Sequence, residues 1–141
     1  MTLPLLRVGN LMTVDPITIG PEAPAVEAER LLKQYRITGL PVIDNDEVIG
    51  VISQTDLVTA RSSELIGGNW GRLRVRHLMT RPVVTVPVTA TVRRAARLMR
   101  DEHIHRIVVI DDDGHPVGVL TTTDLPEVLL DPELETGDED G

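Results

Sequence analysis

The sequence predicts an α+β protein made of two copies of a β-α-β-β-α unit, each with a mixed sheet. The prediction rests on motifs that recur in the same order in both halves of the 141-residue chain. VGNLMT at 8–13 returns as VRHLMT at 75–80, and GVISQTDL at 50–57 returns as GVLTTTDL at 118–125. A repeat that keeps its register over about fifty residues indicates one structural unit written twice.

Each copy is expected to begin with a short strand, at 17–19 in the first and at 83–86 in the second. An amphipathic helix should follow, with Pro24 in its first turn in one copy and Thr91 as its N-cap in the other. Its apolar residues recur at helical spacing: they are Ala25, Ala28, Leu31 and Leu32 in the first copy, and Val92, Ala95, Ala96 and Met99 in the second.

Two apolar runs come next in each copy and predict a β-hairpin. The connections DND at 44–46 and DDDGHP at 111–116 are rich in turn residues. A second helix is expected to begin near Thr55 or Thr123. The strands of the hairpins are predicted at 40–43 with 48–52, and at 107–110 with 117–120.

The chain divides by repeat into residues 1–66 and 75–130, with a linker at 67–74 and an acidic tail at 131–141. The tail composition is typical of a disordered segment. One three-stranded sheet with two helices leaves an apolar sheet face uncovered. We therefore expect the two repeats to pack sheet to sheet with pseudo-twofold symmetry.

The composition argues against several classes of function. The formal net charge is −8, from 14 Lys+Arg and 22 Asp+Glu, which disfavours nucleic-acid binding. There is no Cys, so disulfides, thiolate metal sites and cysteine nucleophiles are absent. No apolar run approaches the length of a membrane span, and no signal-like segment stands at the start. We expect a cytoplasmic protein without membrane association.

The ordered set of motifs resembles a pair of cystathionine-β-synthase-type (CBS) domains, also called a Bateman module. The carriers are LMT in each copy, LPVID at 40–44 with IVVID at 107–111, and the two Gly-Val-apolar-Ser/Thr-x-Thr-Asp segments. The resemblance covers roughly residues 5–130. It implies a sensor of adenosine-containing ligands, AMP, ADP or ATP first, with S-adenosylmethionine or NAD as alternatives and no covalent cofactor. It also implies a homodimer that signals to an effector protein, whose identity the sequence does not reveal.

The residues of the Thr-Asp segments allow two interpretations. A helix N-terminus with hydroxyls beside it suits a phosphate, and a carboxylate can accept two hydrogen bonds from a ribose diol. The spacings Ser53-x-x-Asp56 and Thr121-x-x-Asp124 also fit a helix cap that binds nothing. Gly50 in the first copy permits close approach of another backbone segment, as does its counterpart Gly118.

The resemblance implies two clefts, each shared between the repeats. Site A is expected to contain Ser53, Thr55, Asp56, Thr85, Val86, Ile104, His105 and Arg106. Site B is expected to contain Thr18, Ile19, Ile37, Thr38, Gly39, Thr121, Thr123 and Asp124. The apolar strand residues would enclose the adenine.

The two predicted sites differ in charge. His105 and Arg106 of site A face the expected phosphate, and Arg106 is a permanent cation. Thr38 and Gly39 take the equivalent places in site B and are neutral. We therefore expect a phosphorylated adenosine at site A, and at site B a less charged ligand or none.

Other side chains have simpler explanations. We predict no metal site from His103, His105 and His115, because the sequence offers no fourth ligand. The basic helix face of Arg93, Arg94, Arg97 and Arg100 is interpreted as solvated or as a contact with acidic groups. Trp70 is either an interface anchor or a linker residue tucked over the core, and Met12 and Met79 are expected to pack.

We find no catalytic constellation and predict a protein that is not an enzyme. Asp56 and Asp124 are interpreted as groups that hold a ligand. The alternative function is a structural or interaction module whose clefts hold no physiological nucleotide.

Overall fold

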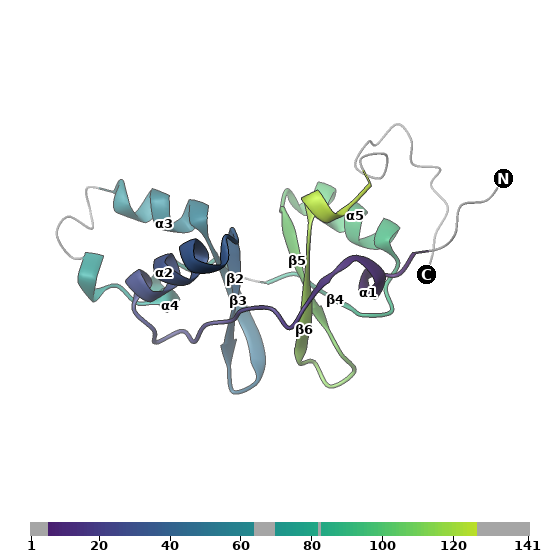
Figure 1. Cartoon of the computed structure of the whole chain (residues 1–141), viewed down its shortest axis with the longest axis horizontal. Coiled ribbons are helices and arrows are strands. Elements are labelled where there is room, and N and C mark those ends of the chain that lie inside the picture. The colour runs from purple at the N-terminus through teal and green to yellow at the C-terminus, as the bar shows by residue number, and fades with distance from the viewer. Residues whose placement is uncertain (1–5, 64–69, 82, 127–141) are drawn as a thin grey trace. The chain divides into compact units, whose positions relative to one another are not determined.

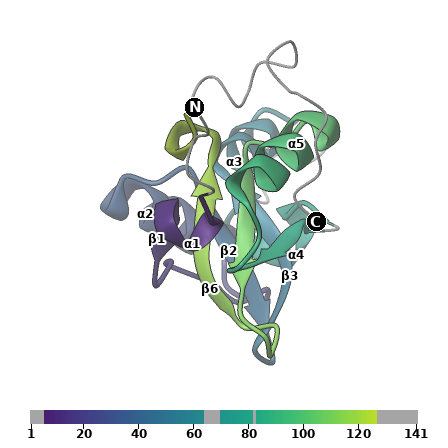
Figure 2. The ribbon, with the colours of Figure 1, turned by 90° about the vertical axis from the view of Figure 1, so that its right-hand side faces the viewer.

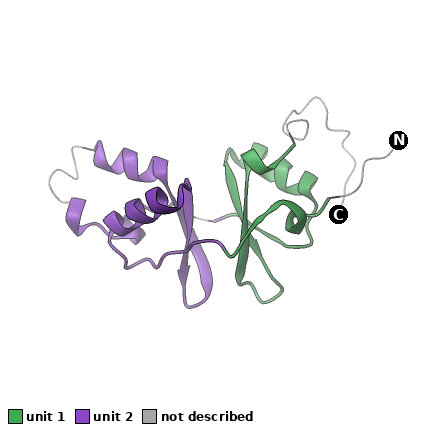
Figure 3. Ribbon diagram, in the orientation of Figure 1, with its two compact units in different colours: residues 1–15, 84–141 green, residues 16–83 purple. Residues whose placement is uncertain are grey.

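A computed structural model describes residues 6–63, 70–81 and 83–126 and confirms the predicted mixed α+β fold. The chain forms two compact units (Figure 3). One unit runs from Pro16 to Val83. The other combines the N-terminal segment, up to Asp15, with the chain from Val84 onward.

The unit from Pro16 to Val83 is built on the antiparallel hairpin of β2 (Gly39–Asp44) and β3 (Glu47–Ser53). Helices α2 (Ala25–Tyr35), α3 (Gln54–Arg61) and α4 (Val75–Leu78) lie on one face of this hairpin (Figure 1). They bury an aliphatic core with the strands, which explains why the chain needs so few aromatic residues. The core residues are Ile19, Ala25, Ala28, Leu32, Leu40, Val42, Ile52, Leu57 and Val75.

The turn of this hairpin has the geometry that its sequence favours. Asn45 and Asp46 connect β2 to β3, and both have positive φ, 51° and 66°. A two-residue turn with two positive φ angles matches the right-handed twist of the strands, and Asn and Asp tolerate this conformation. The predicted turn at 44–46 is confirmed.

The other unit contains a four-stranded mixed sheet in the order β1 (Thr13–Val14), β6 (Pro116–Thr121), β5 (Arg106–Ile110) and β4 (Thr85–Pro87). β4 runs parallel to β5, whereas β6 is antiparallel to both β5 and β1. Figure 2 shows β1 alongside β6.

Helices α1 (Val8–Leu11) and α5 (Val92–Glu102) cover one face of this sheet (Figure 1). The buried residues of α5 recur at helical spacing, so the predicted amphipathic helix is confirmed. Its predicted N-cap is also confirmed, because Thr91 Oγ1 accepts a hydrogen bond from Arg94 N at 3.1 Å. The core residues are Val8, Val86, Ala90, Val92, Ala95, Ala96, Met99, Ile107, Val109, Leu120 and Leu125.

The first predicted strand differs between the copies. The strand expected at 83–86 is β4, whereas within 17–19 Ile19 alone pairs, in a single parallel bridge with Val42. Pro16 and Pro21 flank this segment and lack an N–H, which limits a longer ladder. The sequence did not predict β1, which follows the LM of the first LMT.

The second helix of the second copy is also different in the described residues. Thr122–Asp124 form a 3₁₀ turn, and the residues beyond 126 lie outside the described ranges. The predicted acidic tail at 131–141 and residues 67–69 of the predicted linker lie outside them too. The remaining linker residues belong to the unit from Pro16 to Val83. There Trp70 packs against the core, and its ring centroid lies 4.4 Å from Arg61 Cζ.

The compact units do not follow the sequence repeats. Val8, from the first copy, donates its N–H at 2.8 Å to the carbonyl oxygen of Ala90, which belongs to the second copy. Val75, from the second copy, donates to Ala23 O at 2.9 Å in the unit of the first. Each LMT segment therefore packs on the sheet of the other repeat, whereas the predicted boundaries divide the chain by repeat.

The longest helices described, α2 and α5, have 11 residues each. Within the described ranges, no helix combines the length and the hydropathy that crossing a membrane requires.

Candidate functional site

The first Thr-Asp segment forms a closed helix cap at the end of β3. Ser53 ends the strand, and Asp56 N donates to Ser53 Oγ at 3.1 Å. In return, Ser53 N donates to Asp56 Oδ2 at 2.8 Å. This reciprocal pair satisfies two backbone donors that the helix cannot satisfy itself. The capping interpretation of Ser53-x-x-Asp56 is confirmed, and it fixes where the Asp56 carboxylate lies.

The second Thr-Asp segment is held in a similar way at the end of β6. Thr121 N donates to Asp124 Oδ2 at 2.8 Å, and Thr121 Oγ1 donates to the same oxygen at 3.1 Å. Thr121 Oγ1 and Thr123 Oγ1 share a hydrogen bond of 2.8 Å. Both aspartates are half-buried, while Thr55 and Thr123 are exposed. Each strand therefore ends in an ordered carboxylate with an exposed threonine next to it.

The structure adds Thr80 to the first segment, a residue that the sequence did not single out. Thr80 Oγ1 donates to Asp56 Oδ1 at 3.1 Å and lies 3.4 Å from Oδ2. The signal that could have revealed it is the repetition of LMT itself, since Thr80 ends the second LMT. Within that motif the sequence predicts a role for Met79, in packing, and none for Thr80.

Each unit also places a predicted site segment beside its own Thr-Asp segment. Gly39 pairs with Ser53, and Thr38 O accepts from Gln54 N at 2.9 Å. These contacts join Thr38 and Gly39, predicted in site B, to the segment of Asp56, predicted in site A.

The equivalent arrangement in the second unit involves a cation. Arg106 pairs with Thr121, and His105 O accepts from Thr122 N at 3.0 Å. His105 and Arg106, predicted in site A, therefore lie beside the segment of Asp124, predicted in site B. The pairing of residues across the units stays a prediction from the resemblance.

The predicted strand residues divide into buried and accessible ones. Val86 is fully buried and Ile19 is 7% exposed, so both side chains belong to the cores. Successive residues of an extended chain point to opposite sides, which leaves Thr18 exposed and Thr85 half-buried. Ile37 and Ile104 are half-buried directly after the first helix of each copy. A ligand at these strands would meet the threonines and the isoleucines.

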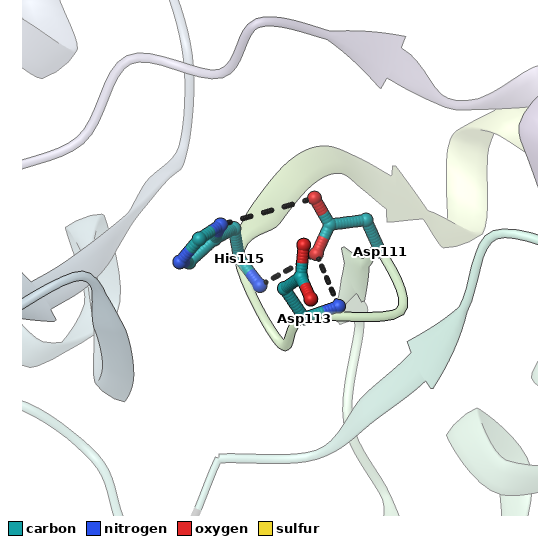
Figure 4. Close-up of side chains that lie close together, drawn as sticks. All are labelled: Asp111, Asp113 and His115. Atoms are coloured by element: carbon teal, nitrogen blue, oxygen red, sulfur yellow. Dashed lines mark hydrogen bonds and ion pairs between the residues drawn. The ribbon is translucent and has the colours of Figure 1, made fainter.

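Three side chains with metal-ligand chemistry lie close together in the turn between β5 and β6. The ligand atoms of Asp111, Asp113 and His115 all lie within 4.8 Å of one another (Figure 4). Asp111 Oδ1 accepts from Asp113 N at 3.0 Å and from His115 N at 2.9 Å. These bonds shape the turn, which accounts for the grouping without an ion. Of the three histidines considered from the sequence, this group contains His115 but not His103 or His105.

Comparison with known proteins shows the family and the fold of this chain. The CBS domain family model matches residues 8–63 and 75–131. The solved structure of CBSX2 in complex with AMP is 32% identical, with a TM-score of 0.73, and the match covers 84% of this chain and 92% of that one. The CBS domain pair of protein MJ0100, in complex with 5′-methylthioadenosine and S-adenosyl-L-methionine, is 27% identical, with a TM-score of 0.75 and coverages of 86% and 93%.

Two archaeal relatives match most of this chain. Uncharacterized protein MJ1232 of Methanocaldococcus jannaschii is 30% identical over 91% of the chain, and uncharacterized protein MK0525 of Methanopyrus kandleri is 34% identical over 87%. The chain spans 41% and 62% of the lengths of these two relatives. Two matches to one family model, in the repeats that the motifs define, show that this chain belongs to the CBS domain family.

Proposed function

We propose that this chain is a regulatory module that binds an adenosine-containing nucleotide and transmits occupancy, as a homodimer, to an effector protein. Three observations support the ligand class. The chain belongs to the CBS domain family, CBSX2 forms a complex with AMP, and the MJ0100 pair forms complexes with 5′-methylthioadenosine and S-adenosyl-L-methionine. AMP, ADP and ATP are the first candidates, and S-adenosylmethionine and NAD are alternatives.

The observation that carries the proposal is the ordered carboxylate at the end of each hairpin. Backbone N–H groups hold Asp56 Oδ2 and Asp124 Oδ2 at 2.8 Å. An ionised carboxylate offers about four lone-pair sites, so each aspartate can still accept hydrogen bonds from the two hydroxyls of a ribose. The exposed hydroxyls of Thr55 and Thr123 stand beside them as donors to phosphate. We expect both aspartates to hold a ligand rather than to transfer a proton.

The composition of each site is part of the proposal. Following the resemblance, site A groups the Asp56 segment with Thr85, Val86, Ile104, His105 and Arg106, and site B groups the Asp124 segment with Thr18, Ile19, Ile37, Thr38 and Gly39. The β5–β6 register favours a second arrangement for one residue, because Arg106 pairs with Thr121. In that arrangement the guanidinium serves the ligand that Asp124 holds.

A thermal-shift series tests the ligand class. Ligands that bind only the folded chain raise the unfolding midpoint, by about 5–10 °C at about 100 times Kd for a chain of this size. We expect such a shift with AMP, ADP or ATP, and none with UMP, which has the same phosphate and ribose but a different base. S-adenosylmethionine and NAD extend the series.

The same series separates the proposal from its rival. If all five adenosine ligands leave the midpoint unchanged at millimolar concentration, the chain is a structural or interaction module without a nucleotide ligand. If UMP shifts the midpoint as far as AMP, the site binds phosphate or ribose without reading adenine.

A further inference from the structure

Thr80 reaches the carboxylate of Asp56 from a segment that is distant in sequence. Thr80 Oγ1 donates to Asp56 Oδ1 at 3.1 Å, while Ser53 N donates to Oδ2 at 2.8 Å. Thr80 Oγ1 also lies 3.4 Å from Oδ2, so its shorter contact is with the oxygen that Ser53 N does not hold. A carboxylate has about four lone-pair sites, so with these two donors bound it can still accept about two hydrogen bonds more. The two donors fix the plane of the carboxylate and leave part of its capacity to accept hydrogen bonds unused.

Backbone pairing with β3 determines where Thr80 lies. Thr80 N donates to Val51 O at 2.8 Å, and Val51 N donates to Thr80 O at 3.2 Å. Gly50 makes this approach feasible: a Cβ at Gly50 would lie 2.9 Å from Met79 Sδ and 3.0 Å from Thr80 O. The second LMT segment thus packs on the Gly-Val segment of β3, and this packing brings the Thr80 hydroxyl to Asp56.

The other copy has the same backbone arrangement without the side-chain contact. Thr13 pairs with Val119, the counterpart of Val51, and Met12 Sδ lies against Gly118. Among the described residues, the hydrogen bonds to Asp124 come from Thr121, and both reach Oδ2. Asp124 therefore lacks the second anchor that Thr80 gives to Asp56.

We propose that Thr80 is a positioning residue for ligand binding: it holds the Asp56 carboxylate in the orientation that receives the ribose diol. This inference rests on the proposed function and deepens it. A side chain that is ordered before binding loses less conformational freedom when the ligand arrives. The two copies are therefore unequal, with Asp56 organised in advance and Asp124 ordered further by the ligand itself.

The experiment measures AMP affinity calorimetrically in the full chain carrying Asp124→Asn, so that the remaining binding event belongs to Asp56. Thr80→Val removes the hydroxyl at nearly constant volume, Thr80→Ser keeps it, and Thr13→Val is the matched control in the other copy. Each variant is also titrated with 2′,3′-dideoxyadenosine 5′-monophosphate, which has no diol for Asp56 to bind. Thermal midpoints show that the variants are folded.

We expect Thr80→Val to weaken AMP binding about 3- to 10-fold, the range that ordering one polar side chain gives. Thr80→Ser and Thr13→Val should bind AMP like the background protein. The affinity for the dideoxy nucleotide should be the same in the background protein and in Thr80→Val, because Thr80 acts only through the contact of Asp56 with the diol.

Three results overturn the inference. The first is unchanged or tighter AMP binding by Thr80→Val, the second is an equal loss for AMP and the dideoxy nucleotide, and the third is failure of Thr80→Ser to restore affinity. If the background protein with intact Thr80 binds no AMP, the proposed function fails at Asp56 and the inference fails with it. If that protein binds AMP and Thr80→Val binds equally well, only the inference fails.

Discussion

At the scale of single residues, charge distinguishes the two copies where their motifs do not. In β5–β6, Arg106 pairs with Thr121, and in β2–β3, Gly39 pairs with Ser53. The same backbone position therefore carries a guanidinium beside one Thr-Asp segment and no side chain beside the other. Arg106 stays charged at every physiological pH and can hold two phosphate oxygens at once. In the proposed function, this asymmetry decides beside which aspartate we expect the phosphate.

Arg106→Ala, combined separately with Asp56→Asn and with Asp124→Asn, tests which ligand the guanidinium serves. The strand register predicts that Arg106→Ala weakens AMP binding about 10-fold or more in the Asp56→Asn background, the effect of losing a charge-assisted hydrogen bond. In the Asp124→Asn background, AMP affinity should stay the same. Isothermal titration gives both constants. Loss of AMP affinity in the Asp124→Asn background alone would support the site A grouping and contradict the arrangement that the strand register favours.

The site residues show what a sequence can predict at this scale. Ser53 with Asp56 and Thr121 with Asp124 were found because a cap needs a fixed local spacing. Thr80 was missed because its contact with Asp56 spans 24 residues and depends on a strand pairing that no local pattern records. Predicting that Arg106 lies opposite Thr121 likewise requires the register of the hairpin.

At the scale of elements, Gly50 and Gly118 let the LMT segments lie against the hairpins. A Cβ at Gly118 would lie 3.0 Å from Thr13 O, and Met12 Sδ comes closer still. A backbone oxygen cannot move aside without disturbing the pairing of β1 with β6. Side-chain size at this glycine is therefore limited by packing, and not by an unusual φ.

Gly118→Ala should destabilise the chain by about 1–3 kcal/mol, the usual effect of overpacking. Gly20→Ala is the matched control, because nothing lies within 4 Å of a Cβ there, and it should change stability by less than about 0.5 kcal/mol. Urea unfolding followed by circular dichroism measures both. Equal stability of the two variants would show that the LMT segment does not press on β6.

Element type was predictable wherever a pattern repeats along the chain. The periodicity of α2 and α5 and the turn residues of both hairpins each determine local structure, and the structure confirms them. β1 was not predictable, because Thr13 and Val14 pair with a strand more than a hundred residues away. Ile19 pairs singly because prolines stand close on both sides.

At the scale of the whole molecule, each compact unit combines parts of both repeats. Val8 and Val75 are fully buried, each in the core that the other repeat builds. The repeats could not reveal this exchange, since VGNLMT and VRHLMT put valine and methionine at the same places and fit either sheet. Both units consequently depend on residues from both halves of the chain.

In the proposed regulatory module, we expect a change in one unit to be passed to the other through the chain segments that connect them. A ligand acts on such a molecule only through its different affinity for two states. We expect AMP to change the free energy of dimerisation or of effector binding by no more than the difference between its binding free energies for the two states. The homodimer, the effector and the cytoplasmic location stay predictions.

The central claim is that the two strand-end aspartates hold an adenosine nucleotide, and calorimetric titration of the Asp56→Asn, Asp124→Asn double variant with AMP tests it most directly. Asparagine keeps an oxygen that can accept the Ser53 or Thr121 N–H, so the caps persist while the charge and half the acceptor capacity for ribose are removed. The account predicts that the unaltered chain binds AMP and that the folded double variant does not. AMP binding by the double variant with the affinity of the unaltered chain would contradict it.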